Sequence, residues 1–192
     1  MSRPTDDRSP RILGGHARGR ALQTPPGLAT RPLRAMVRRS LFDMLGPRVD
    51  GAAVLDLYAG AGGVGFEAFS RGATRVVMVE RDRAALTALR HNLRELRAAP
   101  VVTIVASPVE DYVATARDAG FDLVFVGTPY PLVHTADPAY FQGVLPHLQH
   151  LVGPGGTVVL EAPTGFSPSL EGLSAERFRE YGETTLHFLE RS

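Results

Sequence analysis

Short apolar runs alternate with amphipathic stretches from residue 53 onward. The apolar runs are rich in valine and leucine, which is typical of strands buried on both faces of a parallel sheet. The stretches between them repeat their apolar residues at helical spacing. This alternation predicts an α/β fold, a doubly wound, Rossmann-like and mostly parallel sheet. Strands are predicted at 53–58, 75–80, 101–105, 121–126 and 157–161.

Helices are predicted between these strands and before the first one. Glycine and proline mark their ends, because glycine closes a helix in the left-handed conformation and proline cannot continue one. The first helix opens at Pro32 and stops at Gly46-Pro47. Tyr181-Gly182, between two strand-like runs, predicts a closing antiparallel hairpin at 178–189. The helices are predicted at 32–45, 65–70, 83–97, 109–119 and around 141–148.

Positive charge is concentrated at the amino-terminal end of the chain. The net charge is +1, but residues 1–50 hold ten arginines and four acids, whereas the remainder holds eleven arginines and sixteen acids. A GC-rich genome explains the complete lack of lysine, but it does not explain this asymmetry. Arginine forks suit phosphates and base edges, so this end is expected to contact nucleic acid. The candidate contact residues are Arg11, Arg18, Arg20, Arg31, Arg34 and Arg38.

The chain length of 192 residues suits one domain with a short extension. We expect a disordered leader at 1–10, a basic arm and helix at 11–48, and a cofactor-binding domain at 49–192. The absence of cysteine excludes disulfides and thiolate chemistry, and the histidines show no metal-ligand spacing, so no metal site is expected. No apolar run reaches membrane-spanning length and no signal peptide is evident, which makes the cytoplasm the expected location.

A glycine-rich segment, Asp56-Leu57-Tyr58-Ala59-Gly60-Ala61-Gly62, joins the first strand to a helix. Small residues let the backbone approach a nucleotide-type ligand, and N–H groups at the helix start bind its polar atoms. Asp56 suits a cationic amino-acid group, and Glu80, at the end of the second strand, suits two ribose hydroxyls. S-adenosylmethionine fits these features best, although NAD also fits the loop. The predicted cofactor residues are Asp56, Tyr58, Ala59, Gly60, Gly62, Gly65, Glu80, Arg81, Ser107 and Pro108.

The chain resembles the bacterial methyltransferases that modify a guanine N2 in 16S ribosomal RNA. The resemblance covers nearly the whole chain in the right order. It implies a seven-stranded class I methyltransferase fold, S-adenosylmethionine as donor, and a small-subunit RNA or assembly intermediate as substrate for a monomeric cytoplasmic enzyme. The matching segments are Arg11-Ile12-Leu13-Gly14-Gly15, Arg18-Gly19-Arg20, Thr30-Arg31-Pro32, Leu41-Phe42, 55–60, Phe66-Glu67-Ala68, Ser70-Arg71-Gly72-Ala73, Glu80-Arg81-Asp82, Asn92-Leu93, 121–126, Pro129-Tyr130 and Tyr181-Gly182.

Two segments depart from the family pattern. Relatives end the fourth strand with Asp/Asn-Pro-Pro-Tyr/Phe, where this chain has Gly127-Thr128-Pro129-Tyr130. In that motif a side-chain acceptor and a backbone carbonyl bind the N–H groups of the exocyclic amine, and the aromatic ring stacks on the base. The predicted catalytic residues are Gly127, Thr128, Pro129 and Tyr130; Gly127 lacks the side-chain acceptor, so the Thr128 hydroxyl, the backbone carbonyls and the Tyr130 ring are expected to serve. The second departure is 33–39, where an Asp and the first Arg of the family are lost and a Glu has become Arg39.

Three functions remain open at this point. The leading hypothesis is a guanine-N2 RNA methyltransferase, weakened by the altered motif. The second is an inactive relative that binds RNA and assists ribosome assembly. The third, an NAD-dependent oxidoreductase, fits the loop but explains neither Pro129-Tyr130 nor the basic arm.

Overall fold

The computed structural model describes residues 10–25, 35–116, 120–127 and 138–191. They form one mixed sheet in the order β3-β2-β1-β4-β5-β7-β6. The first five strands are parallel, and β7 pairs antiparallel with both β5 and β6. The predicted doubly wound sheet with an antiparallel end is therefore confirmed. The strands are β1 (Ala53–Leu57), β2 (Arg75–Glu80), β3 (Val102–Ala106), β4 (Phe121–Gly127), β5 (Val152–Pro163), β6 (Leu173–Tyr181) and β7 (Thr184–Arg191).

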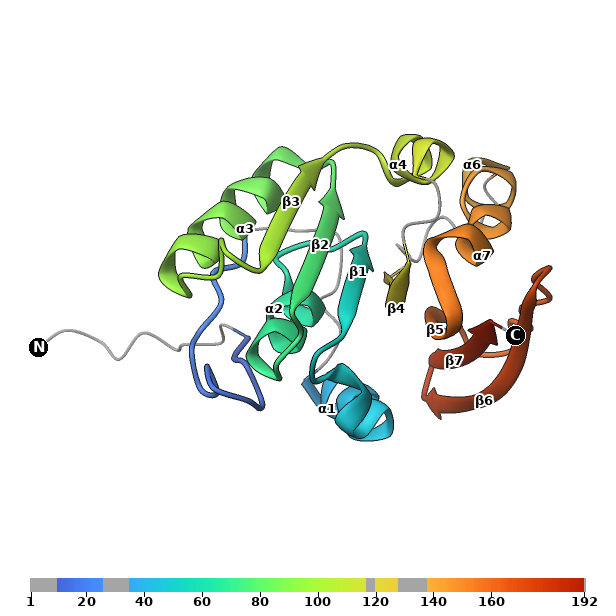
Figure 1. Ribbon diagram of the computed structural model, residues 1–192, viewed down its shortest axis with the longest axis horizontal. Coiled ribbons are helices and arrows are strands. Elements are labelled where there is room, and N and C mark those ends of the chain that lie inside the picture. The colour runs from blue at the N-terminus through green and yellow to red at the C-terminus, as the bar shows by residue number, and fades with distance from the viewer. Residues whose placement is uncertain (1–9, 26–34, 117–119, 128–137, 192) are drawn as a thin grey trace, which may run out of the picture.

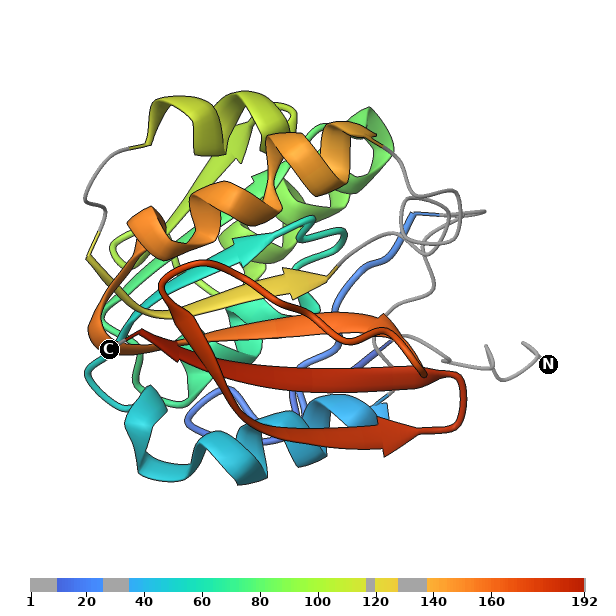
Figure 2. The same cartoon turned by 90° about the vertical axis from the view of Figure 1, so that its right-hand side faces the viewer.

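Helices cover both faces of the sheet (Figure 1, Figure 2). Two buried apolar clusters, one on each face, contain the side chains that hold these layers together. One face carries α1 (Ala35–Leu45), α2 (Gly63–Ser70) and α3 (Arg83–Glu95). The opposite face carries α4 (Val109–Thr115), α6 (Pro138–Gly143) and α7 (Leu148–Leu151). None of the helices in the described parts of the chain is long and apolar enough to cross a membrane.

Among the predicted boundaries that differ from the observed ones, three have an identifiable local cause. The single helix predicted around 141–148 is broken into α6, a 3₁₀ turn at Leu145–His147 and α7. Pro146 lies in that 3₁₀ turn, where its missing N–H interrupts the α-helical hydrogen bonds. Helix α4 ends at Thr115 because Ala116 is extended, and residues 117–119 lie outside the described part. Strand β5 is longer than predicted because the 153–156 turn is a bulge between Val152 and Thr157.

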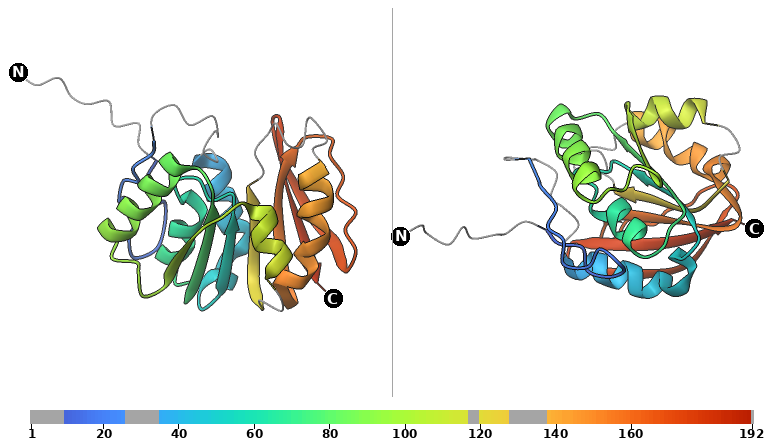
Figure 3. Two further views of the ribbon diagram at one scale, coloured as in Figure 1. Left: turned by 90° about the horizontal axis from the view of Figure 1, so that it is seen from above. Right: turned by 60° about the vertical axis from the view of Figure 1, so that its left-hand side comes forward.

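The amino-terminal arm lies against α2 and α3 (Figure 3). Arg11 and Ala21 form an isolated antiparallel bridge, and hydrogen bonds between Ile12 and Arg20 and between Leu22 and Pro10 continue this pairing. Ile12 and Leu22 are fully buried and belong to the core cluster on the α1 face. The arm is therefore packed as part of the domain rather than extended away from it.

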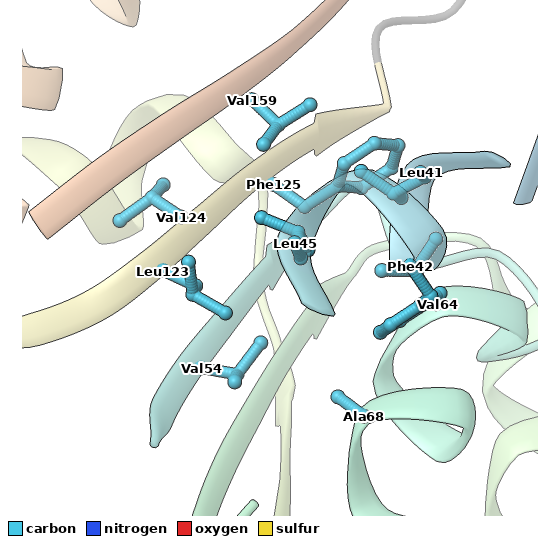
Figure 4. A pocket seen from close by; sticks show the side chains of 10 residues that line it. All are labelled: Leu41, Phe42, Leu45, Val54, Val64, Ala68, Leu123, Val124, Phe125 and Val159. Atoms are coloured by element: carbon cyan, nitrogen blue, oxygen red, sulfur yellow. The ribbon is translucent and has the colours of Figure 1, made fainter. Parts of the chain in front are cut away.

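A small apolar cavity lies between α1 and the sheet (Figure 4). Only apolar side chains line it, from α1, α2, β1, β4 and β5. Phe125 on β4 is one of them, next to Leu41 of α1. Because no polar group faces this space, it is a packing gap in the core and not a cofactor site.

Candidate functional site

The glycine loop sits where β1 ends, at the edge of the sheet that also receives the ends of β2 and β4. Carboxyl ends of parallel strands meet at one edge, which is where ligands bind in open α/β sheets. Tyr58 has a φ of 62° and Gly62 a φ of 85°, so the chain turns sharply into α2. A side chain at Gly62 would approach the Phe66 ring to 2.5 Å. Only glycine fits there, which explains one element of the motif.

Asp56 stabilises this loop through a hydrogen bond to the helix that follows it. Its side chain is 2% exposed, and Oδ2 accepts a hydrogen bond of 2.9 Å from the Gly65 N–H. The carboxylate thus satisfies a free amide in the first turn of α2. Burial raises the pKa of Asp56 to about 7, against the opposing effect of the Gly65 hydrogen bond. One oxygen of Asp56 therefore holds the loop, and contact with an amino-acid group of a ligand stays a prediction.

Glu80 ties the end of β2 to the loop. Its Oε2 accepts from the Gly60 N–H at 2.8 Å, and Oε1 accepts from the N–H groups of Arg81 and Asp82 at 2.8 Å each. Three backbone donors fix the carboxylate at the edge of the sheet. A fixed acceptor at this place is what recognition of ribose hydroxyls requires.

Tyr58, Ser107 and Pro108 line the same edge from the neighbouring elements. The Tyr58 hydroxyl lies 3.4 Å from Oε1 of Glu110 on α4, and it donates to that carboxylate. Burial, followed by the nearby Glu110 charge, raises the pKa of Tyr58. The Ser107 N–H donates to the Glu80 carbonyl at 3.1 Å, which places Ser107 and Pro108 beside the end of β2, where Glu80 lies.

Asn92 is a further residue of this region, and sequence reasoning did not assign it a role. It is 2% exposed on α3, and its Nδ2 donates to the carbonyls of Gln23 and Ala61 at 3.0 and 3.1 Å. Its Oδ1 accepts from the Gln23 N–H at 2.8 Å. Asn92 therefore joins the arm to the glycine loop. A polar residue on the apolar face of an amphipathic helix was the available signal.

The prediction that Arg38 faces RNA is wrong. Arg38 is 1% exposed, because α1 packs it against α2. Its Nη2 donates to the Arg11 carbonyl at 2.5 Å, and its Nε lies 3.7 Å from the carboxylate of the fully buried Glu67. Burial lowers the pKa of Arg38, with Glu67 opposing that shift. Arg38 is an internal ion-pair partner that holds the arm to the core.

The other predicted RNA residues divide into two groups. Arg11, Arg18 and Arg20 are exposed on the arm. Arg20 Nη2 also donates to the Glu95 carbonyl at the end of α3, at 2.8 Å. Arg94 and Arg97, both exposed, flank that contact and extend the positive surface. Arg31 and Arg34 lie outside the described residues.

Of the predicted catalytic residues only Gly127 is described, and Thr128, Pro129 and Tyr130 lie outside the described part. Gly127 ends β4 and pairs with Glu161 of β5. A Cβ built at Gly127 would lie 3.0 Å from Cε1 of Phe125, so a larger residue requires the ring to shift slightly. Across the described ranges, no group of three His, Asp or Glu side chains is arranged to hold a metal ion.

Known proteins share the sequence pattern and the fold of this chain. Residues 10–190 match the model of a family described as conserved hypothetical protein 95. Ribosomal RNA small subunit methyltransferase D of Escherichia coli K12 is 35% identical over 152 residues, 79% of this chain and 71% of that protein. The Bacillus subtilis protein YlbH is 37% identical over 122 residues, 62% of this chain and 66% of its own length. The solved structure of Escherichia coli yhhF has a TM-score of 0.80 at 28% identity, covering 96% of this chain and 98% of that one.

The sheet order, the glycine loop and these likenesses define the class, a methyltransferase with the Rossmann-like class I fold. Within that class, the chain belongs to the conserved hypothetical protein 95 family of ribosomal RNA methyltransferases.

Proposed function

We propose that this protein transfers a methyl group from S-adenosylmethionine to the N2 amine of a guanine in 16S ribosomal RNA. The observation that carries the proposal is the intact cofactor edge, in which Gly60 and Glu80 are joined by a 2.8 Å hydrogen bond. A decayed cofactor site would have no reason to keep a carboxylate held by three amides at this position. Relatives named as small-subunit RNA methyltransferases support the choice of RNA.

The residues at this edge fit S-adenosylmethionine. Glu80 would accept from the ribose hydroxyls, and Ser107-Pro108 would border the adenine. The backbone N–H groups of residues 60–62 would face the amino-acid portion of S-adenosylmethionine, with the buried Asp56 next to this loop. When bound, S-adenosylmethionine supplies an electrophilic methyl carbon on a sulfonium. The loop residues only bind and orient the donor.

The acceptor amine needs help from the protein because its lone pair is delocalised into the guanine ring. Hydrogen-bond acceptors at the amine N–H groups orient that lone pair toward the donor. We propose that Thr128 and the backbone carbonyls of 127–129 act in this way, with Tyr130 stacked on the base. Loss of one well-placed transition-state partner typically costs on the order of 10²–10³ in rate, so the native enzyme is expected to be slow.

We propose that the arm at 11–48 presents the RNA-binding face and that 49–192 forms the catalytic domain. Arg11, Arg18 and Arg20 are exposed on the arm, and Arg94 and Arg97 adjoin them on α3. Arm and loop are linked through Asn92, and this link supports the proposal that RNA bound to the arm reaches the cofactor edge. We also propose that the protein acts as a monomer in the cytoplasm, where ribosomal subunits are assembled.

A second candidate is an inactive relative that binds RNA and assists assembly. The specific observation in its favour is Gly127, which removes a side-chain acceptor from the catalytic motif. The departure from the family pattern at 33–39 also favours an inactive relative. The intact bonds of Glu80 and Asp56 favour the enzyme.

The test is methyl transfer with donor carrying a trideuterated methyl group, using naked 16S RNA and small-subunit assembly particles as substrates. Nucleoside digestion and mass spectrometry identify the product, which we expect to be N2-methylguanosine. Label on another base would contradict guanine N2. Donor binding without any transfer would favour the assembly factor, and binding of NAD in place of the donor would favour an oxidoreductase.

A further inference from the structure

Glu161 stands next to the altered motif on the neighbouring strand. In β5 it pairs with Gly127 of β4 on one side and with Leu186 of β7 on the other. Residues paired across adjacent strands present their side chains to the same face of a sheet. Val159, two positions earlier, and Leu186 both belong to the core cluster on the α1 face. Glu161 therefore projects on that face, at the edge where the parallel strands end.

Gly127 places no side chain beside Glu161, and the ring of Phe125 borders that space, 3.0 Å from where a Cβ would lie. Phe125 belongs to the same cluster, so a side chain at 127 would also project on the α1 face. The acid that relatives carry at that position would thus stand beside Glu161, with the backbones roughly 5 Å apart. A glutamate side chain is about that long. Its carboxylate can reach the space that the missing acid would fill.

The surroundings of Glu161 do not explain it as a structural residue. It is partly buried, and none of the described residues forms a hydrogen bond or ion pair with its carboxylate. Burial raises its pKa to about 7. The side chains on its face from the flanking strands are Leu186 of β7 and, two strands away, Arg179 of β6. A partly buried carboxylate without such a partner is costly for folding, and groups of this kind gather at functional sites.

We propose that Glu161 is a catalytic residue that accepts the N–H of the target amine, in place of the acid absent from position 127. This inference rests on the proposed methyl transfer. The amine lone pair forms the new N–C bond while the C–S bond of the donor breaks, and its electron pair stays on sulfur. The proton released from the amine passes to the Glu161 carboxylate and then to solvent. Because the register of β4 and β5 pairs Gly127 with Glu161, the Glu161 carboxylate would lie beside the target guanine.

The test compares Glu161→Gln with wild type in the transfer assay on assembly particles. Glu176→Gln, an exposed carboxylate on β6, is the matched control. We expect Glu161→Gln to lower kcat 10²–10³-fold, with the affinity for S-adenosylmethionine and the KM for RNA within threefold of wild type. The wild-type rate should fall as pH drops through about 7, because a carboxyl that is already protonated cannot take up the proton released from the amine, and this inflection should be lost in Glu161→Gln. Asp56 is expected to titrate in the same range but remains in both proteins.

A rescue variant separates a chemical role from a structural one. In Gly127→Asp/Glu161→Gln the family acid returns on the adjacent strand, and we expect at least tenfold recovery of kcat over Glu161→Gln. The ring of Phe125 can make room, because it borders the apolar cavity beneath α1 (Figure 4).

The outcomes separate this inference from the function on which it rests. An active wild type with Glu161→Gln within threefold of it would overturn the role of Glu161 and leave the methyltransferase intact. Wild type that binds the donor but methylates neither RNA nor particles would overturn both. Should Glu161→Gln fail to bind the donor, the wild-type pH profile decides, and a flat profile between pH 6 and 8 overturns the proposal.

Discussion

Single carboxylates at the cofactor edge do different jobs because their surroundings differ. Glu80 is held by three backbone amides at the surface of the edge, whereas Asp56 is buried beneath the loop and bonded to Gly65. Hydrogen bonds to a charged group are worth more than neutral ones, about 1.5–3 kcal/mol each. Glu80 is therefore preorganised to accept from a ligand, and Asp56 to hold the helix start.

The first prediction concerns Glu80→Gln. The amide removes the charge and replaces one acceptor with a donor, so the ribose hydroxyls lose a partner. We expect the affinity for S-adenosylmethionine to fall roughly 10- to 100-fold, measured by titration calorimetry. Glu171→Gln, an exposed acid before β6, is the control and should bind as wild type does. Affinity within twofold of wild type in Glu80→Gln would remove Glu80 from the ribose site.

The second prediction concerns stability and pH at Glu161. Its folded-state pKa is raised from 4.5 to about 7, so its contribution to stability is full at pH 4 and lost as pH rises through about 7. Glu161→Gln removes this dependence. The free energy of unfolding of the variant, relative to that of wild type, should therefore rise from pH 5 to pH 8.5. We expect this rise to be at most about 2–3 kcal/mol. Urea unfolding of both proteins at the two pH values measures this change. An equal difference in unfolding free energy at both pH values would mean that Glu161 is not buried in the folded protein.

At the scale of elements, the arm docks on α2 through a few close contacts. The Glu67 carboxylate accepts from the Leu13 N–H at 2.7 Å and from Arg71 Nε at 2.8 Å. Ser70 Oγ donates to the Gly14 carbonyl at 2.6 Å and accepts from the Ala17 N–H. The arm backbone is thus bonded to polar side chains of one helix, so α2 positions both the cofactor loop and the arm.

The third prediction compares two arm glycines. A Cβ at Gly15, where φ is +74°, would lie 1.6 Å from the Ser70 carbonyl oxygen, whereas Gly19, at φ +85°, has nothing within 4 Å. Both alanine variants carry the backbone penalty of about 1–2 kcal/mol, but only Gly15→Ala also forces the arm off α2. We expect Gly15→Ala to lose about 2 kcal/mol more than Gly19→Ala in urea unfolding. Equal losses would show that the arm does not dock tightly.

Sequence patterns predict the elements better than they predict the partners across elements. Apolar runs identified the strands of the parallel sheet, and Tyr181-Gly182 identified the hairpin, because these signals are local. The burial of Arg38 was missed because arginine is usually exposed, and its partner Glu67 lies on another helix. Glu161 could be placed on a strand, but its position beside Gly127 depends on strand register, which local patterns do not set.

At the scale of the whole molecule, a basic surface lies at the carboxyl-terminal end of α3, about one helical turn beyond the residue that contacts the glycine loop. The arm contributes Arg18 and Arg20, and the end of α3 contributes Arg94 and Arg97. Asn92 links this basic surface to the glycine loop. A phosphate backbone bound to the basic surface would place a nearby base at the cofactor edge.

The fourth prediction measures this surface by its salt dependence. Each phosphate contact contributes about 0.7–0.9 to the slope of log affinity against log salt concentration. The double variant Arg18→Gln/Arg20→Gln should therefore reduce the slope by about 1.5 and weaken binding of 16S RNA at low salt. Arg75→Gln is the control, because this exposed arginine begins β2 and therefore lies at the edge of the sheet opposite the cofactor edge. An unchanged slope in the double variant would exclude these two arm residues as RNA contacts.

The central claim is that this chain methylates a guanine N2 of small-subunit RNA, and the most direct measurement is made on RNA from cells that lack its gene. Nucleoside mass spectrometry of that 16S RNA should show one N2-methylguanosine fewer per molecule than in the parent. The wild-type gene should restore it, and a Glu80→Gln copy should restore it only in part. An unchanged N2-methylguanosine content in the deletion strain would contradict the account.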